Sequence, residues 1–165
     1  MIRLCPVTHA NLWQLAALDV LPHQREWVSS VPVSLMQAYC TLAGGGTALP
    51  LGIYEDDVPV GFAMIEFGEL PDTENVPLAA GNYCIRRFLI DAHYQRQGVG
   101  RRAFAALLDY IRTLPCGPAP LCWISYHTDN LVAARLYASF GFVPNGEKDG
   151  IEDIAVLKLE KDGCL

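Results

Sequence analysis

The amino-acid sequence predicts a single α+β domain over residues 1–165, in which one sheet packs against helices. The chain has 165 residues, a length that suits one domain burying roughly 70% of its unfolded surface. Hydrophobic residues make up 52% and charged residues 18%, which is too apolar for a disordered chain. Segments typical of strands and helices follow one another in the order β-α-α-β-β-β-α-β-α-β-β, without a repeat or a linker.

The beginning of the chain reads as one strand and two helices. Residues 2–7 form the first predicted strand. Thr8 is placed to cap a helix that continues to about Asp19. After an irregular stretch, Pro32 suits the first turn of a second helix, where the missing N–H of proline costs nothing. The glycines at 44–46 are expected to end that helix.

Three strands are predicted in the middle of the chain. Residues 47–56 and 58–67 favour an antiparallel hairpin that turns at Asp56 and Asp57. Residues 68–81, rich in proline, glycine and acidic side chains, read as a loop, and residues 82–91 read as the next strand.

The remaining elements alternate between helix and strand. Residues 98–114 are predicted to form an amphipathic helix, and residues 120–127 a strand. A helix over 130–140 is expected to be capped by Asp129 or Thr128, and segments 142–147 and 151–160 finish as a strand pair. The apolar stripe of the helix predicted over 98–114 consists of Val99, Phe104, Leu107, Leu108, Ile111 and Leu114.

Charge and cysteine usage restrict the classes of partner. Twelve Lys and Arg stand against eighteen Asp and Glu, and the net charge of −6 disfavours nucleic acid and anionic membranes as partners. The six cysteines form no C-x-x-C pair and no zinc-type spacing with histidine, so we expect no metal. Because there is neither a signal-peptide pattern nor an apolar run of about 18 residues, a cytoplasmic protein is expected.

The stretch QRQGVG, residues 95–100, places two glycines between a predicted strand and a predicted helix. The first N–H groups of a helix have no intrahelical acceptor and lie at the positive end of its dipole, where a phosphate binds readily. Arg96, Arg101 and Arg102 add positive charge. The stretch is neither a Rossmann fingerprint, since residue 103 is alanine, nor a Walker A loop. A tight turn without a ligand is the alternative.

Asn130 and Tyr137 are seven residues apart, so they fall on one face of the predicted helix. Ala133 and Ala134 lie between them and leave room beside that face. A tyrosine on a helix is more often part of the core, and this remains the alternative to a catalytic phenol.

Together these two motifs resemble those of the GNAT superfamily of acetyl-CoA-dependent N-acetyltransferases. Gln95 to Gly100 matches the pattern Q/R-x-x-G-x-G/A, and Asn130 to Phe142 matches N-x-x-A-x-x-L-Y-x-x-x-G-F. The resemblance covers nearly the whole chain and is strongest over 82–143. Within the superfamily, the chain looks most like the bacterial spermine/spermidine acetyltransferases. The resemblance implies one mixed, mostly antiparallel sheet of about seven strands flanked by about four helices.

The resemblance also implies a reaction. Acetyl-CoA, with no metal, gives its acetyl group to a primary amine of a small molecule by direct attack in a ternary complex, and a polyamine such as spermidine or spermine is the leading acceptor. Tyr137 is then the general acid for the leaving thiolate. The residues implied to bind the cofactor are Phe88, Leu89, Ile90, Gln95, Arg96, Gln97, Gly98, Val99, Gly100, Arg101, Asn130 and Tyr137.

The acceptor side is less defined by the motifs. Glu66 is the candidate base, with a solvated surface carboxylate as the alternative; Cys84 occupies a position where some members have a carboxylate. Other candidate bases are Glu69, Glu26 and Tyr83, and the candidate acceptor-binding residues are Glu26, Arg87 and Glu152.

Two adjacent arginines, Arg86 and Arg87, leave the acceptor open. Pointing into the cleft, either would favour a carboxylate-bearing acceptor; alternatively, they pair with a neighbouring strand or with the acidic residues of loop 69–74. An amino acid, an aminoglycoside-like drug and a protein amine are the alternative acceptors. A CoA-binding sensor without catalysis is the alternative function, and a homodimer through the last strands is a possible assembly.

Overall fold

The computed structural model describes residues 1–70 and 76–159. Its seven strands form one sheet in the order β1-β2-β3-β4-β5-β7-β6, in which only the β4–β5 pair is parallel. This confirms the predicted mixed, mostly antiparallel sheet. The strands are β1 (Ile2–Pro6), β2 (Thr47–Glu55), β3 (Val58–Phe67), β4 (Tyr83–Ile90), β5 (Leu121–His127), β6 (Val143–Asp149) and β7 (Glu152–Lys158).

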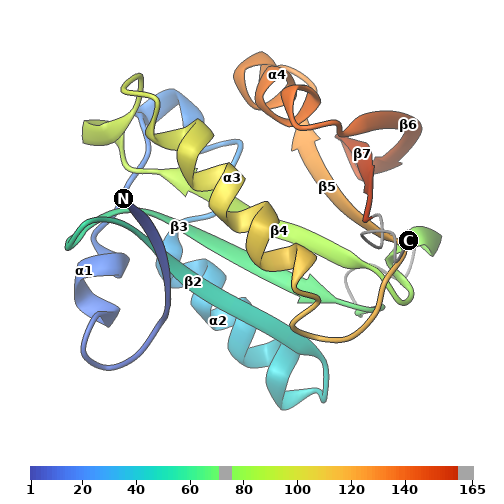
Figure 1. Cartoon of the computed structure of the whole chain (residues 1–165), viewed down its shortest axis with the longest axis horizontal. Helices are drawn as coiled ribbons and strands as arrows, with labels where there is room; N and C mark the ends of the chain where they lie inside the picture. Colours follow the sequence, from blue (N-terminus) through green and yellow to red (C-terminus); the bar gives the residue numbers. More distant parts are fainter. Residues whose placement is uncertain (71–75, 160–165) are drawn as a thin grey trace, which may run out of the picture.

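Four α-helices cover the two faces of the sheet (Figure 1). Helices α1 (Leu12–Ala16) and α2 (Val31–Ala43) pack on one face, and α3 (Val99–Arg112) and α4 (Leu131–Ser139) on the other. Successive side chains of β3 point to opposite faces of the sheet and so contribute to both cores. Ile65 packs in the core with α3, and Met64 packs in the core with α1 and α2. We call these sides the α3–α4 face and the α1–α2 face.

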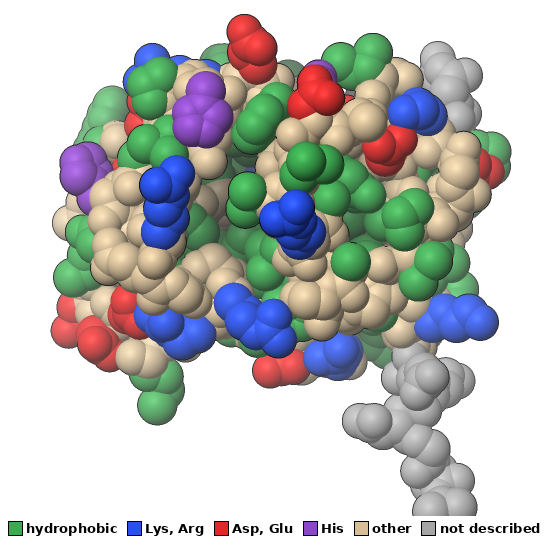
Figure 2. Space-filling model, turned by 90° about the horizontal axis from the view of Figure 1, so that it is seen from above, with side chains coloured by type: hydrophobic (Ala, Val, Ile, Leu, Met, Phe, Trp, Pro, Cys, Tyr) green, Lys and Arg blue, Asp and Glu red, His purple; other side chains and the backbone are tan. Residues whose placement is uncertain are grey.

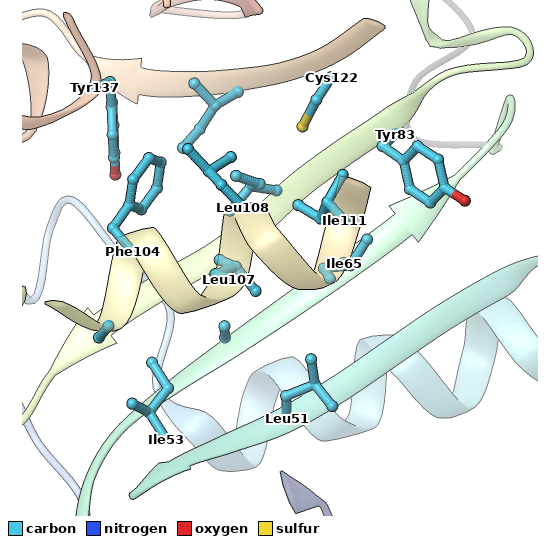
Figure 3. Close-up of a cluster of buried hydrophobic side chains, with 14 of the residues drawn as sticks. Leu51, Ile53, Ile65, Tyr83, Phe104, Leu107, Leu108, Ile111, Cys122 and Tyr137 are labelled. Carbon is cyan, nitrogen blue, oxygen red and sulfur yellow. The ribbon is translucent and has the colours of Figure 1, made fainter. Parts of the chain in front are cut away.

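The apolar stripe of α3 is buried as predicted, except at its end. Phe104, Leu107, Leu108 and Ile111 point from α3 toward the sheet (Figure 3). Leu114 lies beyond the helix, which ends at Arg112 with Thr113 as its C-cap, and it is only partly buried.

The structure corrects the predicted bounds of α1 and the predicted cap of α4. Helix α1 spans only Leu12–Ala16 rather than running from Thr8 to Asp19, because Thr8 begins a turn and the backbone N–H of Asp19 is bound by a distant carboxylate. The cap of α4 is Asn130, whose Oδ1 accepts a hydrogen bond of 3.2 Å from the N–H of Ala133, and not Asp129 or Thr128.

Strands β4 and β5 pair only at their beginnings and then diverge. Their register contains two pairs, Tyr83 with Cys122 and Cys84 with Trp123. Just beyond this point the β3–β4 register shifts, so that Arg86 is an extra, bulged residue of β4. The rest of β4 therefore has a strand partner on its β3 edge and none on its β5 edge. In the described part of the chain, no helix could cross a membrane and no group of side chains could hold a metal ion.

Asp91 fixes the chain where β4 ends. Its carboxylate accepts hydrogen bonds of 3.0 Å from the backbone N–H groups of Asp19 and His93, and it lies 2.7 Å from Nδ1 of His93. Burial alone would raise the pKa of Asp91, but these donors outweigh burial and the pKa lies below its ordinary value. The carboxylate therefore ties segment 19–20, one wall of the cleft described below, to the sheet.

Replacing Asp91 with asparagine is expected to lower stability by about 1 kcal/mol at pH 7. A carboxyl whose pKa is depressed on folding stabilises the fold above its unfolded pKa of about 4, and this contribution is lost as the pH falls through the folded value. Urea unfolding should thus show the difference between wild type and Asp91→Asn shrinking as the pH falls below about 4. Asp57→Asn, at an exposed carboxylate, is the control; a difference that is constant or grows on acidification contradicts the assignment.

Candidate active site

A cleft of about 840 Å³ opens where β4 and β5 diverge. Its walls come from segment 20–29, from β4 and the turn after it, and from β5, α4 and the β6–β7 hairpin. Figure 2 shows it as a hollow between two lobes, with hydrophobic side chains inside and several Lys or Arg side chains around it.

The cleft connects the two faces of the sheet. On β5, Ile124 and Tyr126 belong to the α3–α4 core, and the ring of Tyr126 lies 5.6 Å from that of Tyr137. Ser125 points the other way, as does His127, whose ring lies 6.4 Å from that of Trp27 on the α1–α2 face. A ligand entering from each face would therefore meet the other between the diverging strands.

The glycine turn has the backbone geometry of a helix start. Gly98 is the N-cap of α3 with a left-handed φ of +75°, and Arg96 before it has a φ of +61°. Arg96 lines the cleft and makes no hydrogen bond or ion pair with any described residue. Arg102 instead pairs with Glu55, and Arg101 donates to the hydroxyl of Ser139. Positive charge beside the cleft thus comes from Arg96 and from the N–H groups that begin α3.

Not every residue predicted to bind the cofactor lines the cleft. Val99 is buried in the core, and the side chain of Gln97 donates to the carbonyl of His93. Gln95 donates to the carbonyl of Ile90 at 2.9 Å and exchanges two hydrogen bonds with Gln24, so its side chain joins the turn to segment 20–29. The residues of the predicted set that do line the cleft are Phe88, Leu89, Ile90, Gln95, Arg96, Gly100, Asn130 and Tyr137.

Tyr137 projects from the last turns of α4 toward Phe104 (Figure 3). Its hydroxyl has no hydrogen-bond partner among the described residues. Burial raises the pKa of Tyr137 far above that of a free phenol, and the charge of Glu152 raises it further. The side chain is therefore a neutral phenol at neutral pH. Asn130 lines the same cleft, and its Nδ2 has no partner in the described structure.

Arg86 is neutralised by two carboxylates. Its Nε lies 3.6 Å from Oε2 of Glu66, and its Nη1 lies 3.5 Å from Oδ2 of Asp149. The side chain of Glu66 is only 3% exposed, so the interpretation of Glu66 as a solvated surface carboxylate is wrong. Glu66 is buried because its partner lies on the next strand, and it does not line the cleft.

Arg87 points to α2, and its hydrogen-bond partners among the described residues are neutral. It donates to Oε1 of Gln37 at 2.5 Å, to the hydroxyl of Ser29 at 3.3 Å and to the carbonyl of Arg86 at 2.7 Å. Its Nε is buried without a hydrogen-bond partner. Burial and the charge of Arg86 lower the pKa of Arg87, which remains a cation at neutral pH and lines the cleft.

Two carboxylates of the cleft have no ion-pair partner among the described residues, Glu26 and Glu152. Oε2 of Glu152 accepts a hydrogen bond of 2.5 Å from the hydroxyl of Ser125. The charge of Glu152 is close enough to influence both Tyr137 and Arg87. This carboxylate therefore lies near both the phenol and the guanidinium on β4.

The other candidate bases lie outside the cleft. Tyr83 is fully buried, donates to the carbonyl of Gly117 and accepts from the N–H of Cys116. Burial raises the pKa of the Cys84 thiol, which excludes a thiolate base at neutral pH. Glu69 is exposed and does not line the cleft, and residues 71–74 of the acidic loop lie outside the described residues.

Trp27, Ser125 and Asp149 are part of the cleft and were not expected from the sequence. Trp27 and Ser125 belong to no motif, and Asp149 reaches the site only because the β6–β7 hairpin places it beside the bulge at Arg86. Trp27 directly follows Arg25 and Glu26 in an irregular segment, and an aromatic residue next to charged ones was the available signal.

Comparison with known proteins gives a family match and two close curated relatives. Residues 12–142 match the acetyltransferase (GNAT) family model. The chain is 33% identical over 151 residues to a "Probable spermine N(1)-acetyltransferase" of Bacillus subtilis subsp. natto, covering 90% of this chain and 91% of the relative. It is 32% identical over the same length to a "Spermine/spermidine N(1)-acetyltransferase" of Bacillus subtilis strain 168, with the same coverage.

Two solved structures bound to coenzyme A share the fold. An aminoglycoside acetyltransferase, AAC(6')-Ib, superposes with a TM-score of 0.75 at 20% identity, covering 96% of this chain and 95% of that chain. The PaiA N-acetyltransferase of Thermoplasma acidophilum superposes with a TM-score of 0.63 at 14% identity, covering 96% and 99%. At these identities the likeness concerns the fold alone.

Proposed function

The chain belongs to the acetyltransferase (GNAT) family, and from this premise we propose that it acetylates a primary amine of a polyamine such as spermidine or spermine. The enzyme is an acetyl-CoA-dependent N-acetyltransferase. The observation that carries the proposal is the cleft between β4 and β5, which has a neutral phenol toward the α3–α4 face and two carboxylates without ion-pair partners, Glu26 and Glu152.

The residues of the α3–α4 face fit coenzyme A. The N–H groups at the start of α3, with Arg96, would hold the pyrophosphate. At Phe88, Leu89 and Ile90, the edge of β4 that faces β5 has no strand partner among the described residues. Its backbone groups are therefore available to the amides of the pantetheine arm. The N–H of Leu89 or Ile90 would then stabilise negative charge on the thioester oxygen, and Asn130 would donate its free amide to the arm.

Two protons have to move. An alkylammonium has a pKa of about 10.4 and must lose a proton before its nitrogen attacks the thioester. Glu66 is buried against Arg86, so we assign it to holding that arginine, and we assign the proton acceptor to Glu152, acting directly or through water. When the C–S bond breaks, the Tyr137 phenol would donate its proton to the thiolate sulfur, and the second proton of the attacking nitrogen would pass through water to the tyrosinate and restore the phenol.

The charges of the acceptor side support a cationic substrate. Glu66 and Asp149 offset the charge of Arg86. Arg25, which also lines the cleft, pairs with Asp19 at 2.6 Å. Glu26 and Glu152 are then the carboxylates left to attract ammonium groups, and the two Bacillus relatives carry polyamine names over 90% of this chain. We further propose a bacterial, cytoplasmic enzyme, with the exposed edge strand β6 as the place for a homodimer contact.

One observation favours a second acceptor class. Arg87 is a cation of the cleft without a carboxylate partner, and it would bind an acceptor that itself carries a carboxylate, such as an amino acid. In that case Arg87→Gln would remove most of the activity, whereas a polyamine should be acetylated by this variant at least as well as by wild type.

Thiol release from acetyl-CoA tests the proposal with a panel of spermine, spermidine, putrescine, amino acids, an aminoglycoside and a lysine peptide. The expected result is turnover strongest with spermine or spermidine. Turnover confined to carboxylate-bearing amines would replace the polyamine by the second class. Tight binding of coenzyme A without turnover on any amine would point to a sensor instead of an enzyme for these acceptors.

A further inference from the structure

Three aromatic side chains meet at the α1–α2 end of the cleft. Trp27 stacks on His127 with ring centroids 6.4 Å apart and planes 26° apart, and His23 meets Trp27 edge-on at 5.8 Å. Trp27 belongs to the segment before α2, and His127 ends β5, so the stack joins the two halves of the molecule across the opening between the diverging strands. Trp27 and His23 both line the cleft.

His127, the partner of Trp27 in the stack, also lies opposite a carboxylate. His127 is the register partner of Glu152 in the antiparallel β5–β7 pair, and side chains directly opposite one another have their Cβ atoms about 5 Å apart on the same face of the sheet. Ser125, two residues before His127 and on the same face, donates to Glu152 and fixes the position of the carboxylate. Trp27 and Glu152 are therefore both neighbours of His127, and both line the cleft.

This part of the cleft has the chemistry that recognises an alkylammonium group. An indole attracts a cation over its face more strongly than the other aromatic rings do, and a carboxylate without another cation supplies the counter-charge. Glu26 precedes Trp27 and adds a second carboxylate lining the cleft. Three arginines of the cleft are turned to other partners: Arg87 on β4 to Gln37, Arg86 to Glu66 and Asp149, and Arg25 to Asp19.

We infer that Trp27 and Glu152 form a subsite for the second ammonium group of the acceptor, the one next to the amine that is acetylated. This inference rests on the proposed function. It deepens that proposal, because it separates diamines and polyamines from simple alkylamines. Glu152 thus serves both nitrogens of the acceptor: it holds the second ammonium and lies near the position where the first loses its proton. His127 is a positioning residue, since it acts through the ring of Trp27.

The test compares 1,4-diaminobutane with 1-aminopentane, in which a methyl group replaces the second ammonium. For Trp27→Leu, kcat/KM for the diamine is expected to fall about 10-fold through a higher KM, while kcat/KM for the monoamine changes less than about 2-fold. Trp27→Phe should lie between wild type and Trp27→Leu for the diamine. Trp13→Leu is the matched control, because Trp13 is 80% exposed on α1 and does not line the cleft.

A binding measurement separates this inference from the proposed function. Calorimetry measures the affinity of 1,4-diaminobutane for each variant saturated with coenzyme A, so no turnover is required. Weaker binding to Trp27→Leu than to wild type and Trp13→Leu supports the subsite, whether or not any amine is acetylated. A lack of acetylation would refute only the assignment of a polyamine as the acceptor. Equal losses of kcat/KM for the diamine and the monoamine would overturn the subsite. So would diamine binding that Trp27→Leu does not weaken, or a lack of diamine binding in wild type.

Discussion

Replacing Tyr137 with phenylalanine is expected to reduce kcat at least about tenfold while the affinity for coenzyme A stays within about twofold of wild type. The substitution removes one oxygen that has no hydrogen-bond partner among the described residues, and it keeps the ring contacts with Phe104 and Tyr126. Packing is thus preserved, and the loss falls on the step that needs the proton. Steady-state kinetics and equilibrium binding of coenzyme A measure the two quantities separately.

The environment of Tyr137 explains why a phenol serves here. In water a phenol of pKa about 10 gives a proton to a thiolate of pKa about 8.5 only at a cost of about 2 kcal/mol. Burial raises the pKa of Tyr137, and a thiolate leaving in the same cleft would be desolvated as well, so its own proton affinity rises with that of the phenol. Because the pKa of Tyr137 lies far above neutrality, its ionisation should produce no fall in kcat below about pH 10.

Tyr126→Phe is the control for this assignment, because Tyr126 is a second phenol of the same cleft. It should retain most of the turnover. If Tyr126→Phe is inactive and Tyr137→Phe is fully active, the acid is Tyr126 and the role given to Tyr137 is wrong.

Local patterns predicted the elements well because they depend on short-range periodicity. The stripe of α3 and the glycine turn before it follow from spacing and backbone freedom alone. Helix α1 is shorter than its pattern because a long-range bond, from the N–H of Asp19 to Asp91, draws the chain away after Ala16. A helix that depends on a partner 72 residues away cannot be bounded from its own sequence.

The acceptor side of the site could not be predicted for the same reason. Because of the bulge, Arg86 and Arg87 both stand between Ile85 and Phe88 of the α3–α4 core and turn away from it, whereas strict alternation predicts that adjacent residues point to opposite faces. Glu66 looked solvated because its partner Arg86 is distant in sequence, and Trp27 carried no motif. The side of the cleft that carries the two motifs was predictable, because each motif lies within one continuous segment, the glycine turn or α4.

Replacing Gly98 with valine is expected to abolish measurable binding of coenzyme A. Gly98 has a φ of +75°, which a β-branched residue adopts only with strain, and it is the residue from which α3 starts. The added Cβ would lie 3.1 Å from Nη1 of Arg102, a mobile side chain, so packing alone does not forbid the substitution. The loss should come from the N–H groups of the turn, which a shifted backbone no longer directs at a pyrophosphate.

Gly45→Val distinguishes a binding defect from a folding defect. Gly45 has a φ of +85° and nothing within 4 Å of an added Cβ, and it lies in the turn between α2 and β2, away from the cleft. Both variants should lose stability by a similar amount in thermal unfolding without ligand. Only Gly98→Val should fail to gain stability when coenzyme A is added, because stabilisation by a ligand requires binding to the folded state. Normal stabilisation of Gly98→Val by coenzyme A would show that the glycine turn is a tight connection and not the pyrophosphate site.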